Sequence, residues 1–66
     1  MSNESEIELE VALDQVQPRH ASRDAFSIDG NGALQYRFRD TLTVAKAAAI
    51  VAELREVQSA LARIQR

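Results

Sequence analysis

The segment EIELEVAL, residues 6–13, has a pattern that fits two kinds of secondary structure. Every odd position from Ile7 to Leu13 is apolar, and the even positions hold three glutamates and an alanine. Such strict alternation is typical of a half-buried strand. The competing interpretation is a helix, because Ser5 and Glu8 have the spacing of a capping box and Glu, Leu and Ala favour helices. Four successive apolar odd positions favour the strand.

A polar connection, QVQPRHASRD, follows at residues 15–24. Pro18 cannot donate a hydrogen bond to a sheet, and it disfavours a helical conformation at Gln17. The connection also contains a small group of cationic or titratable residues, Arg19, His20 and Arg23. This group is consistent with an anion site, but a solvated loop is the favoured interpretation.

The next segment, IDGNGALQYRFRD at residues 28–40, predicts a β-hairpin. A two-residue turn at Asn31 and Gly32 would mix apolar and polar side chains on both faces of the sheet. A three-residue loop at 30–32 separates the faces, and it places Gly32 where left-handed backbone is needed. The predicted pairs are Phe26 with Tyr36, Ser27 with Gln35, Ile28 with Leu34 and Ala25 with Arg37. A calcium loop is disfavoured, because Ala33 and Leu34 replace a ligand and the required glycine.

Residues 43–66 predict one long helix, because the segment contains no Gly or Pro and is rich in Ala, Leu, Glu, Arg and Gln. Thr43 is the expected N-cap. Its apolar residues follow alternating steps of three and four, which is a coiled-coil pattern. The predicted oligomer seam consists of Ala47, Ile50, Leu54, Val57, Leu61 and Ile64.

The lengths of these elements suggest an assembly. A helix of this length spans about 35 Å, whereas a seven-residue strand spans about 23 Å. The end of the helix would therefore overhang the sheet, so we expect the seam to pack on another copy, as a dimer or tetramer, or on a different protein.

The expected fold is an α+β domain, a three-stranded antiparallel β-meander followed by one long C-terminal α-helix that oligomerises. The strands are expected at about 6–14, 24–29 and 33–39. The whole chain, 1–66, forms a single domain, with 1–5 disordered, 6–40 in the sheet and 43–66 in the helix. The predicted core comprises Ile7, Leu9, Val11, Leu13, Phe26, Ile28, Leu34, Tyr36, Phe38, Leu42, Val44, Ile50, Val51 and Leu54.

Length and composition limit the function. A chain of 66 residues is marginally stable alone, and without cysteine it cannot form disulfides, so oligomerisation is the expected means of stabilisation. No apolar run has the length of about 20 residues that a membrane span requires, and the acidic N-terminus lacks signal-peptide features. We expect a cytoplasmic protein that does not bind membranes.

An enzyme is not expected from this sequence. It has no cysteine, a single histidine at position 20 and no glycine-rich loop that opens a helix. No cofactor and no metal ion are therefore expected, and no catalytic residue is assigned.

The expected function is a non-enzymatic protein–protein interaction module, acting as a homo-oligomeric adaptor, an assembly subunit or an inhibitor of a larger protein. Residues 1–14 carry five acidic side chains and no Lys or Arg, so an acidic face could meet a basic partner. The alternative is a small oligomeric nucleic-acid-binding regulator that uses the outward arginines of strand 33–39. The candidate partner-binding residues are Glu6, Glu8, Glu10, Arg37 and Arg39.

Overall fold

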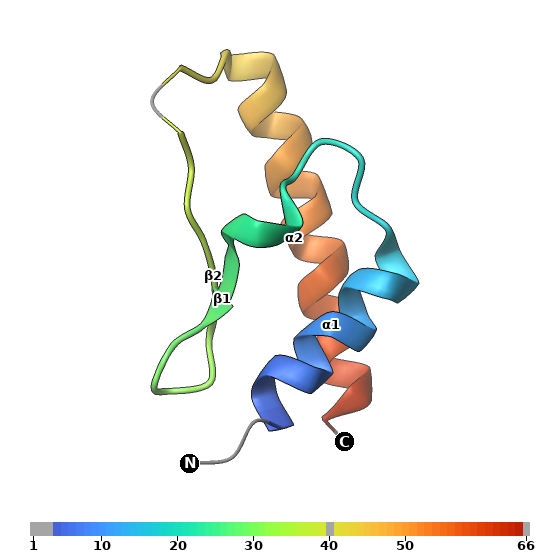
Figure 1. Ribbon diagram of the computed structural model, residues 1–66. Helices are drawn as coiled ribbons and strands as arrows, with labels where there is room; N and C mark the ends of the chain where they lie inside the picture. Colours follow the sequence, from blue (N-terminus) through green and yellow to red (C-terminus); the bar gives the residue numbers. More distant parts are fainter. Residues whose placement is uncertain (1–3, 40, 66) are drawn as a thin grey trace.

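The computed structural model describes residues 4–39 and 41–65, which form two helices and a small hairpin (Figure 1). The elements, in order, are α1 (Glu4–Val16), the 3-10 turn η1 (Arg23–Ala25), β1 (Phe26–Ile28), β2 (Leu34–Tyr36) and α2 (Val44–Ile64). The α+β class is confirmed. The prediction of three strands is wrong, because the described residues contain a two-stranded sheet.

The first predicted strand is instead part of α1, which begins at Glu4. The side chains it buries are Leu9, Ala12 and Leu13, with Val16 packed beside them. This spacing of three and four residues is helical. The alternating strand pattern does not place Ala12 or Val16 in the core. The predicted disorder at 1–5 falls partly on residues 1–3, which lie outside the described residues.

The hairpin follows the predicted register. Phe26 pairs with Tyr36, and Ile28 pairs with Leu34, in an antiparallel sheet. Gly32 has φ of +83°, which is the left-handed conformation expected at the end of a three-residue loop. The strands are shorter than predicted, with three residues each.

The loop of the hairpin is organised by one carboxylate. The Asp29 Oδ1 atom accepts hydrogen bonds from the backbone N–H groups of Asn31 and Ala33, each at 2.9 Å. The Gln35 side chain donates to the other oxygen of Asp29 at 3.1 Å. These bonds lower the pKa of Asp29, and the bond from Ala33 has the largest effect. Residues 29–33 are thus a locally satisfied turn.

The long helix α2 confirms the prediction for residues 43–66 apart from its last residues, since it ends at Ile64 and residue 66 lies outside the described residues. Thr43 is the N-cap, and its hydroxyl accepts a hydrogen bond from the Lys46 N–H at 3.1 Å. Within residues 4–39 and 41–65, no helix is long and apolar enough to cross a membrane.

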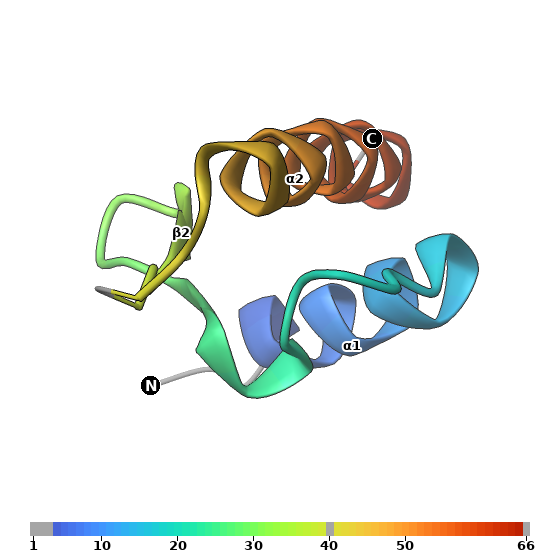
Figure 2. The ribbon, with the colours of Figure 1, turned by 90° about the horizontal axis from the view of Figure 1, so that it is seen from above.

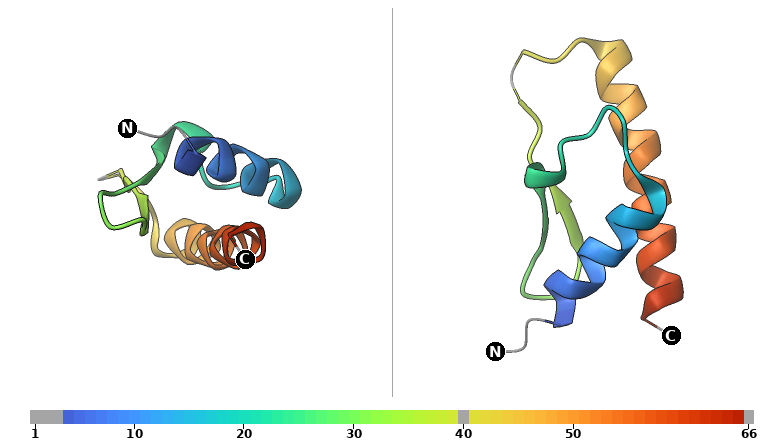
Figure 3. Two further views of the ribbon diagram at one scale, coloured as in Figure 1. Left: turned by 90° about the horizontal axis from the view of Figure 1, so that it is seen from below. Right: turned by 45° about the vertical axis from the view of Figure 1, so that its right-hand side comes forward.

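The two helices and the hairpin surround one small core (Figure 2). Helix α1 packs against the C-terminal half of α2 and runs in the opposite direction, with the hairpin along their side (Figures 1 and 3). Val57 is fully buried and Ile50 is 2% exposed, and burying such a side chain contributes about 1.5–3 kcal/mol. Ala12 and Ala60 are also fully buried, and small side chains of this kind let neighbouring elements approach closely.

The core differs from the predicted one at the ends of the molecule. Leu9, Leu13, Phe26 and Ile50 are buried as predicted. Partly buried residues around them are Ile28, Leu34, Tyr36, Leu42 and Leu54. The prediction is wrong for five residues that are exposed, Ile7, Val11, Phe38, Val44 and Val51. Two of these lie on α1, where a helix turns odd positions away from the core that a strand would have faced.

The predicted oligomer seam of α2 lies against the rest of the same chain. Ile50, Val57 and Leu61 are buried in the core. The partly buried members of the seam are Ala47, Leu54 and Ile64. The seam has this cover because residues 4–16 form a helix that lies along it, instead of a strand that would be too short.

A buried carboxylate on α2 joins the helix to the connection after α1. Glu53 is 9% exposed, and its oxygens accept hydrogen bonds from the backbone N–H groups of Arg19 at 2.8 Å and Ala21 at 2.6 Å. The His20 N–H donates at 3.0 Å, and the His20 ring Nδ1 lies 3.2 Å from the same carboxylate. We call this arrangement of Glu53 with residues 19–21 the Glu53 clasp.

The clasp sets the pKa of its carboxylate. Burial raises the pKa of Glu53, but the backbone N–H groups of His20, Ala21 and Arg19 together outweigh it and lower the pKa from 4.5 to about 2. Glu53 is therefore ionised at neutral pH. The clasp fixes the connection directly before η1, and so positions the turn that leads into β1.

The residues that end α1 direct the chain into this connection. Gln17 has φ of +52°, a left-handed conformation that commonly follows the last residue of a helix. Its N–H donates to the Leu13 carbonyl at 2.7 Å. Pro18 follows and cannot continue the helix, so the chain turns towards Glu53 at this point.

Candidate functional site

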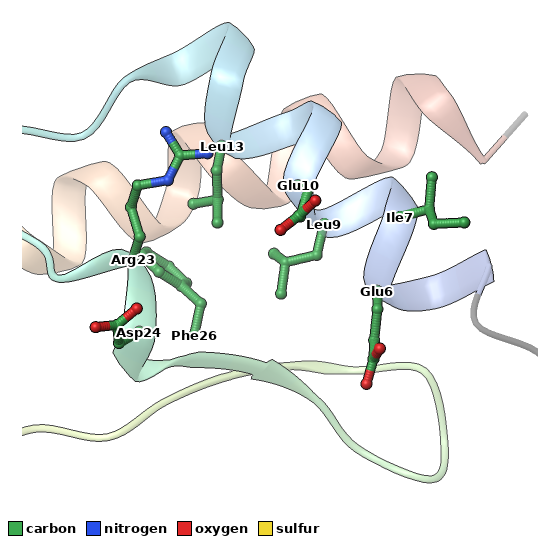
Figure 4. A pocket seen from close by; sticks show the side chains of 8 residues that line it. All are labelled: Glu6, Ile7, Leu9, Glu10, Leu13, Arg23, Asp24 and Phe26. Carbon is green, nitrogen blue, oxygen red and sulfur yellow. The ribbon is translucent and has the colours of Figure 1, made fainter.

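An open groove lies between α1 and the chain from η1 to β1, with a cavity volume of about 610 Å³ (Figure 4). Both walls supply apolar and charged side chains. We call it the acidic groove, and it is lined by Glu6, Ile7, Leu9, Glu10, Leu13, Arg23, Asp24 and Phe26. Its position follows from the Glu53 clasp, because the clasp holds the residues directly before the η1 wall.

The floor of the groove is apolar, and its rim is negatively charged. Leu9, Leu13 and Phe26 belong to the core and form the floor between the two walls (Figure 4). Glu6 and Glu10 stand on the α1 side. A chain with a complementary surface could therefore bury apolar side chains on the floor while cationic groups meet the rim.

The single cation of the rim is already paired. The Arg23 guanidinium donates to the Asp14 carboxylate at 2.7 Å, across from η1 to α1. Asp24, next to it on η1, is exposed and adds a further carboxylate to the groove. The free charge presented by the rim is therefore negative.

The structure separates the three predicted glutamates of the acidic segment. Glu6 and Glu10 line the groove, one helical turn apart. Glu8 does not line it. Instead, its carboxylate accepts a hydrogen bond from the Gln65 side chain at 3.3 Å, which links α1 to the C-terminal end of α2.

The predicted arginines lie at a second, smaller depression. Arg37 and Arg39 line a cleft of about 270 Å³ between the chain after β2, the connection at 20–22 and the first turns of α2. Lys46 and His20 also line this cleft, together with Tyr36. We call it the basic cleft. The prediction that both arginines point outward agrees with their exposure.

The aromatic residues beside the arginines form a small stack. The Phe26 and Tyr36 rings lie 4.8 Å apart at 69°, and the Tyr36 and Phe38 rings lie 4.9 Å apart at 70°. The Tyr36 hydroxyl accepts a hydrogen bond from the Ser22 N–H at 2.9 Å. Tyr36 is thus engaged with the core and the connection, whereas Phe38 ends the stack and is 43% exposed.

The sequence pattern does not predict the η1 wall or the Glu53 clasp. It places Arg23 only in a loop cluster and gives Asp24 no role in a site. A signal for Glu53 was present, because it lies three residues after Ile50 and four before Val57, on the face of the helix that those apolar residues define. A charged residue on that face requires a partner.

In the part of the chain that the structure describes, no three His, Cys, Asp or Glu side chains come together in a group that could hold a metal ion. Comparison with protein-family models, with curated proteins and with solved structures found no match to this chain.

Proposed function

We propose that this protein is a non-enzymatic binding module that takes a cationic and apolar segment of a partner protein in the acidic groove. The observation that carries the proposal is the groove itself, whose core-facing floor of Leu9, Leu13 and Phe26 lies between carboxylates on two different elements. Such a module would serve as an adaptor, an assembly subunit or an inhibitor.

The chemistry of the groove favours binding over catalysis. Its polar groups are Glu6, Glu10, Arg23 and Asp24, and all four are exposed to solvent. Catalytic acids and bases work in desolvated surroundings that shift their proton affinity. Exposed carboxylates around an apolar floor instead resemble the polar rim and apolar centre of a protein interface.

The charge of the groove selects its partner. Nucleic acid would be repelled by Glu6 and Glu10, and the arginines that could contact phosphates lie in the basic cleft. A protein segment that alternates cationic and apolar residues satisfies both parts of the groove. Ile7, which is 61% exposed beside the rim, would lose contact with water in such a complex.

A direct test is an NMR titration with a short synthetic peptide of alternating Lys and Leu residues. We expect chemical-shift changes centred on Leu9, Leu13 and Phe26. The double variant Glu6→Lys, Glu10→Lys should weaken binding by about tenfold or more, because two attractive contacts become repulsive.

The matched control changes the same kind of charge outside the groove. Glu56 is exposed on α2 and does not line the groove, so Glu56→Lys should bind the peptide about as well as the native chain. Equal binding by the native chain and the Glu6, Glu10 variant, or shifts that avoid the groove, would contradict the proposal.

A further inference from the structure

The basic cleft has unpaired positive charge. Arg37, Arg39 and Lys46 are exposed, and none of them makes an ion pair within the described residues. The described residues that line the cleft include no Asp or Glu. The cleft also lies at the start of α2, where the helix dipole adds partial positive charge. This surface suits an anionic partner.

Both charged surfaces have large apolar side chains beside them that contact solvent. Ile7 lines the acidic groove and is 61% exposed, and Val11, one helical turn further along α1, is 41% exposed. Phe38, which lies between Arg37 and Arg39 in the sequence, is 43% exposed, and Val44, at the start of α2, is 88% exposed. The two surfaces are therefore opposite in charge, and each offers apolar area that would be buried in contact with a suitable partner.

The two surfaces adjoin at residues 22–26, because Ser22 and Ala25 line the cleft and Asp24 and Phe26 line the groove, and from there they extend in different directions over an elongated molecule. The chain measures 35 × 21 × 15 Å along its principal axes. The N-terminal end of α1, with Glu6, and the start of α2, with Lys46, are at opposite ends in Figure 1 and in the right-hand view of Figure 3. Among the described residues no ion pair joins Glu6 or Glu10 to a cation of the cleft, whereas a second copy could supply such cations.

We propose that the occupant of the acidic groove is the basic cleft of a second copy of this chain. This inference rests on the proposed function, and it names the partner. Arg37 and Arg39 of one copy would face Glu6 and Glu10 of the other. Groove-to-cleft contacts of this kind form either twice, in a two-fold dimer in which each copy uses both surfaces, or once per pair in a head-to-tail assembly.

Head-to-tail contacts have a consequence for size. The contact uses two different surfaces, so each added copy leaves one free groove and one free cleft. The assembly then grows into chains, or closes into a ring if the rotation between copies allows it. Because the contacts are exposed ion pairs, growth should weaken steeply as salt is added.

The test uses two neutralised double variants, each lacking one of the two surfaces. Arg37→Gln, Arg39→Gln removes the charge of the cleft, and Glu6→Gln, Glu10→Gln removes that of the groove. Sedimentation velocity at low salt should show dimers or larger species for the native chain and a monomer for each variant. An equimolar mixture of the variants should give a dimer that grows no further, since it restores one native contact.

Matched variants control for charge and folding. Arg55 and Arg63 are exposed on α2 outside the cleft, so Arg55→Gln, Arg63→Gln should assemble like the native chain. Circular dichroism should show native helix content in all variants. These side chains are exposed, and a variant that lost helix would be replaced by the corresponding single substitution.

Three results would overturn the inference: a native chain that stays monomeric at low salt, assembly that neither double variant reduces, or a mixture that does not form dimers. If the native chain stays monomeric and binds DNA with a salt-dependent affinity that the cleft variant loses, the cleft is a nucleic-acid site instead. A monomer that still binds the Lys-Leu peptide in the groove would leave the proposed function standing. If both the sedimentation experiment and the peptide titration fail, both the assembly and the proposed function are rejected.

Discussion

Two carboxylates in this chain are each held by backbone N–H groups of a short loop, and they differ in burial and in reach. Glu53 accepts from three successive residues that lie 32 to 34 positions earlier in the sequence. Asp29 accepts from two residues within four positions of itself. Glu53 is 9% exposed, whereas Asp29 lies at the surface.

The difference shows how the same hydrogen-bond pattern performs two tasks. At Asp29, water competes for every bond, so the carboxylate shapes a turn whose strands already pair. At Glu53, loss of these bonds would leave poorly hydrated N–H groups and a desolvated charge without partners, which is costly in free energy. The buried carboxylate therefore defines tertiary structure, and it fixes the approach to the η1 wall of the acidic groove.

The largest expected effect comes from breaking the buried clasp. Glu53→Gln keeps the shape of the side chain, but it replaces one acceptor oxygen with an NH₂ group that opposes the donors. We expect a loss of about 2–3 kcal/mol in the free energy of unfolding, measured by urea denaturation. Glu56→Gln, at an exposed site on the same helix, should change it by less than about 0.5 kcal/mol. Equal losses from the two variants would contradict the role of the clasp.

A smaller effect is expected from the backbone of the exposed turn. Gly32→Ala places a side chain at φ of +83°, which should cost about 1 kcal/mol. Gly30 provides the control, because its φ is outside the left-handed range and a Cβ there would meet nothing within 4 Å. In thermal unfolding, the Tm of Gly30→Ala should equal or exceed the Tm of the native chain. Destabilisation of both variants by the same amount would argue against a specific requirement at Gly32.

The smallest effect is expected at the exposed carboxylate itself. Asp29→Ala removes the acceptor for Asn31 and Ala33, but water can take its place. We expect a small decrease in Tm, less than that of Gly32→Ala, with the cross-strand contacts of Phe26 and Tyr36 preserved in NMR spectra. A Tm decrease as large as that of Glu53→Gln would show that burial does not account for the difference between the two carboxylates.

The parts of the fold that the sequence predicts are those fixed by neighbours along the chain. The register of the hairpin follows from face parity and the loop glycine, so Phe26 and Tyr36 pair as expected. The cap of α2 follows from Thr43. In both cases the deciding residues are within about ten positions of each other, and local physics suffices.

The segment 6–13 could not be assigned by the same reasoning. Its period of two is real in the sequence, yet Leu9, Ala12, Leu13 and Val16 pack together because the seam of α2 provides a matching surface. Tertiary packing therefore determines which of two locally acceptable structures, strand or helix, this segment forms. This choice also decided which side chains are exposed, including Ile7 and Val11.

Only those residues of the candidate site that stand out by local charge or alternation could be predicted from the sequence. Charge alone predicts Glu6 and Glu10 as candidate partner-binding residues, and alternation predicts Arg37 and Arg39. The opposite wall of the groove, with Asp24 and Phe26, depends on how the Glu53 clasp folds the connection back across the helices. Contacts over more than thirty positions are not encoded in a local pattern.

Burial raises the pKa of the Glu53 carboxyl group, but the N–H groups of residues 19–21 outweigh this effect, so Glu53 is held as a buried anion. A lowered pKa means that the unfolded chain binds the proton more tightly. The clasp therefore contributes fully above pH 4.5, and the contribution, about 2 kcal/mol after allowing for solvent screening, is lost as the pH falls towards 2.

The measurement is an NMR titration of the Glu53 side-chain carboxyl carbon. We predict that Glu53 stays ionised in the folded chain through pH 4.5 and titrates near pH 2. Titration of the folded chain at the ordinary value of 4.5 would contradict the account, because the N–H groups of Arg19, His20 and Ala21 would then provide no net stabilisation of the charge.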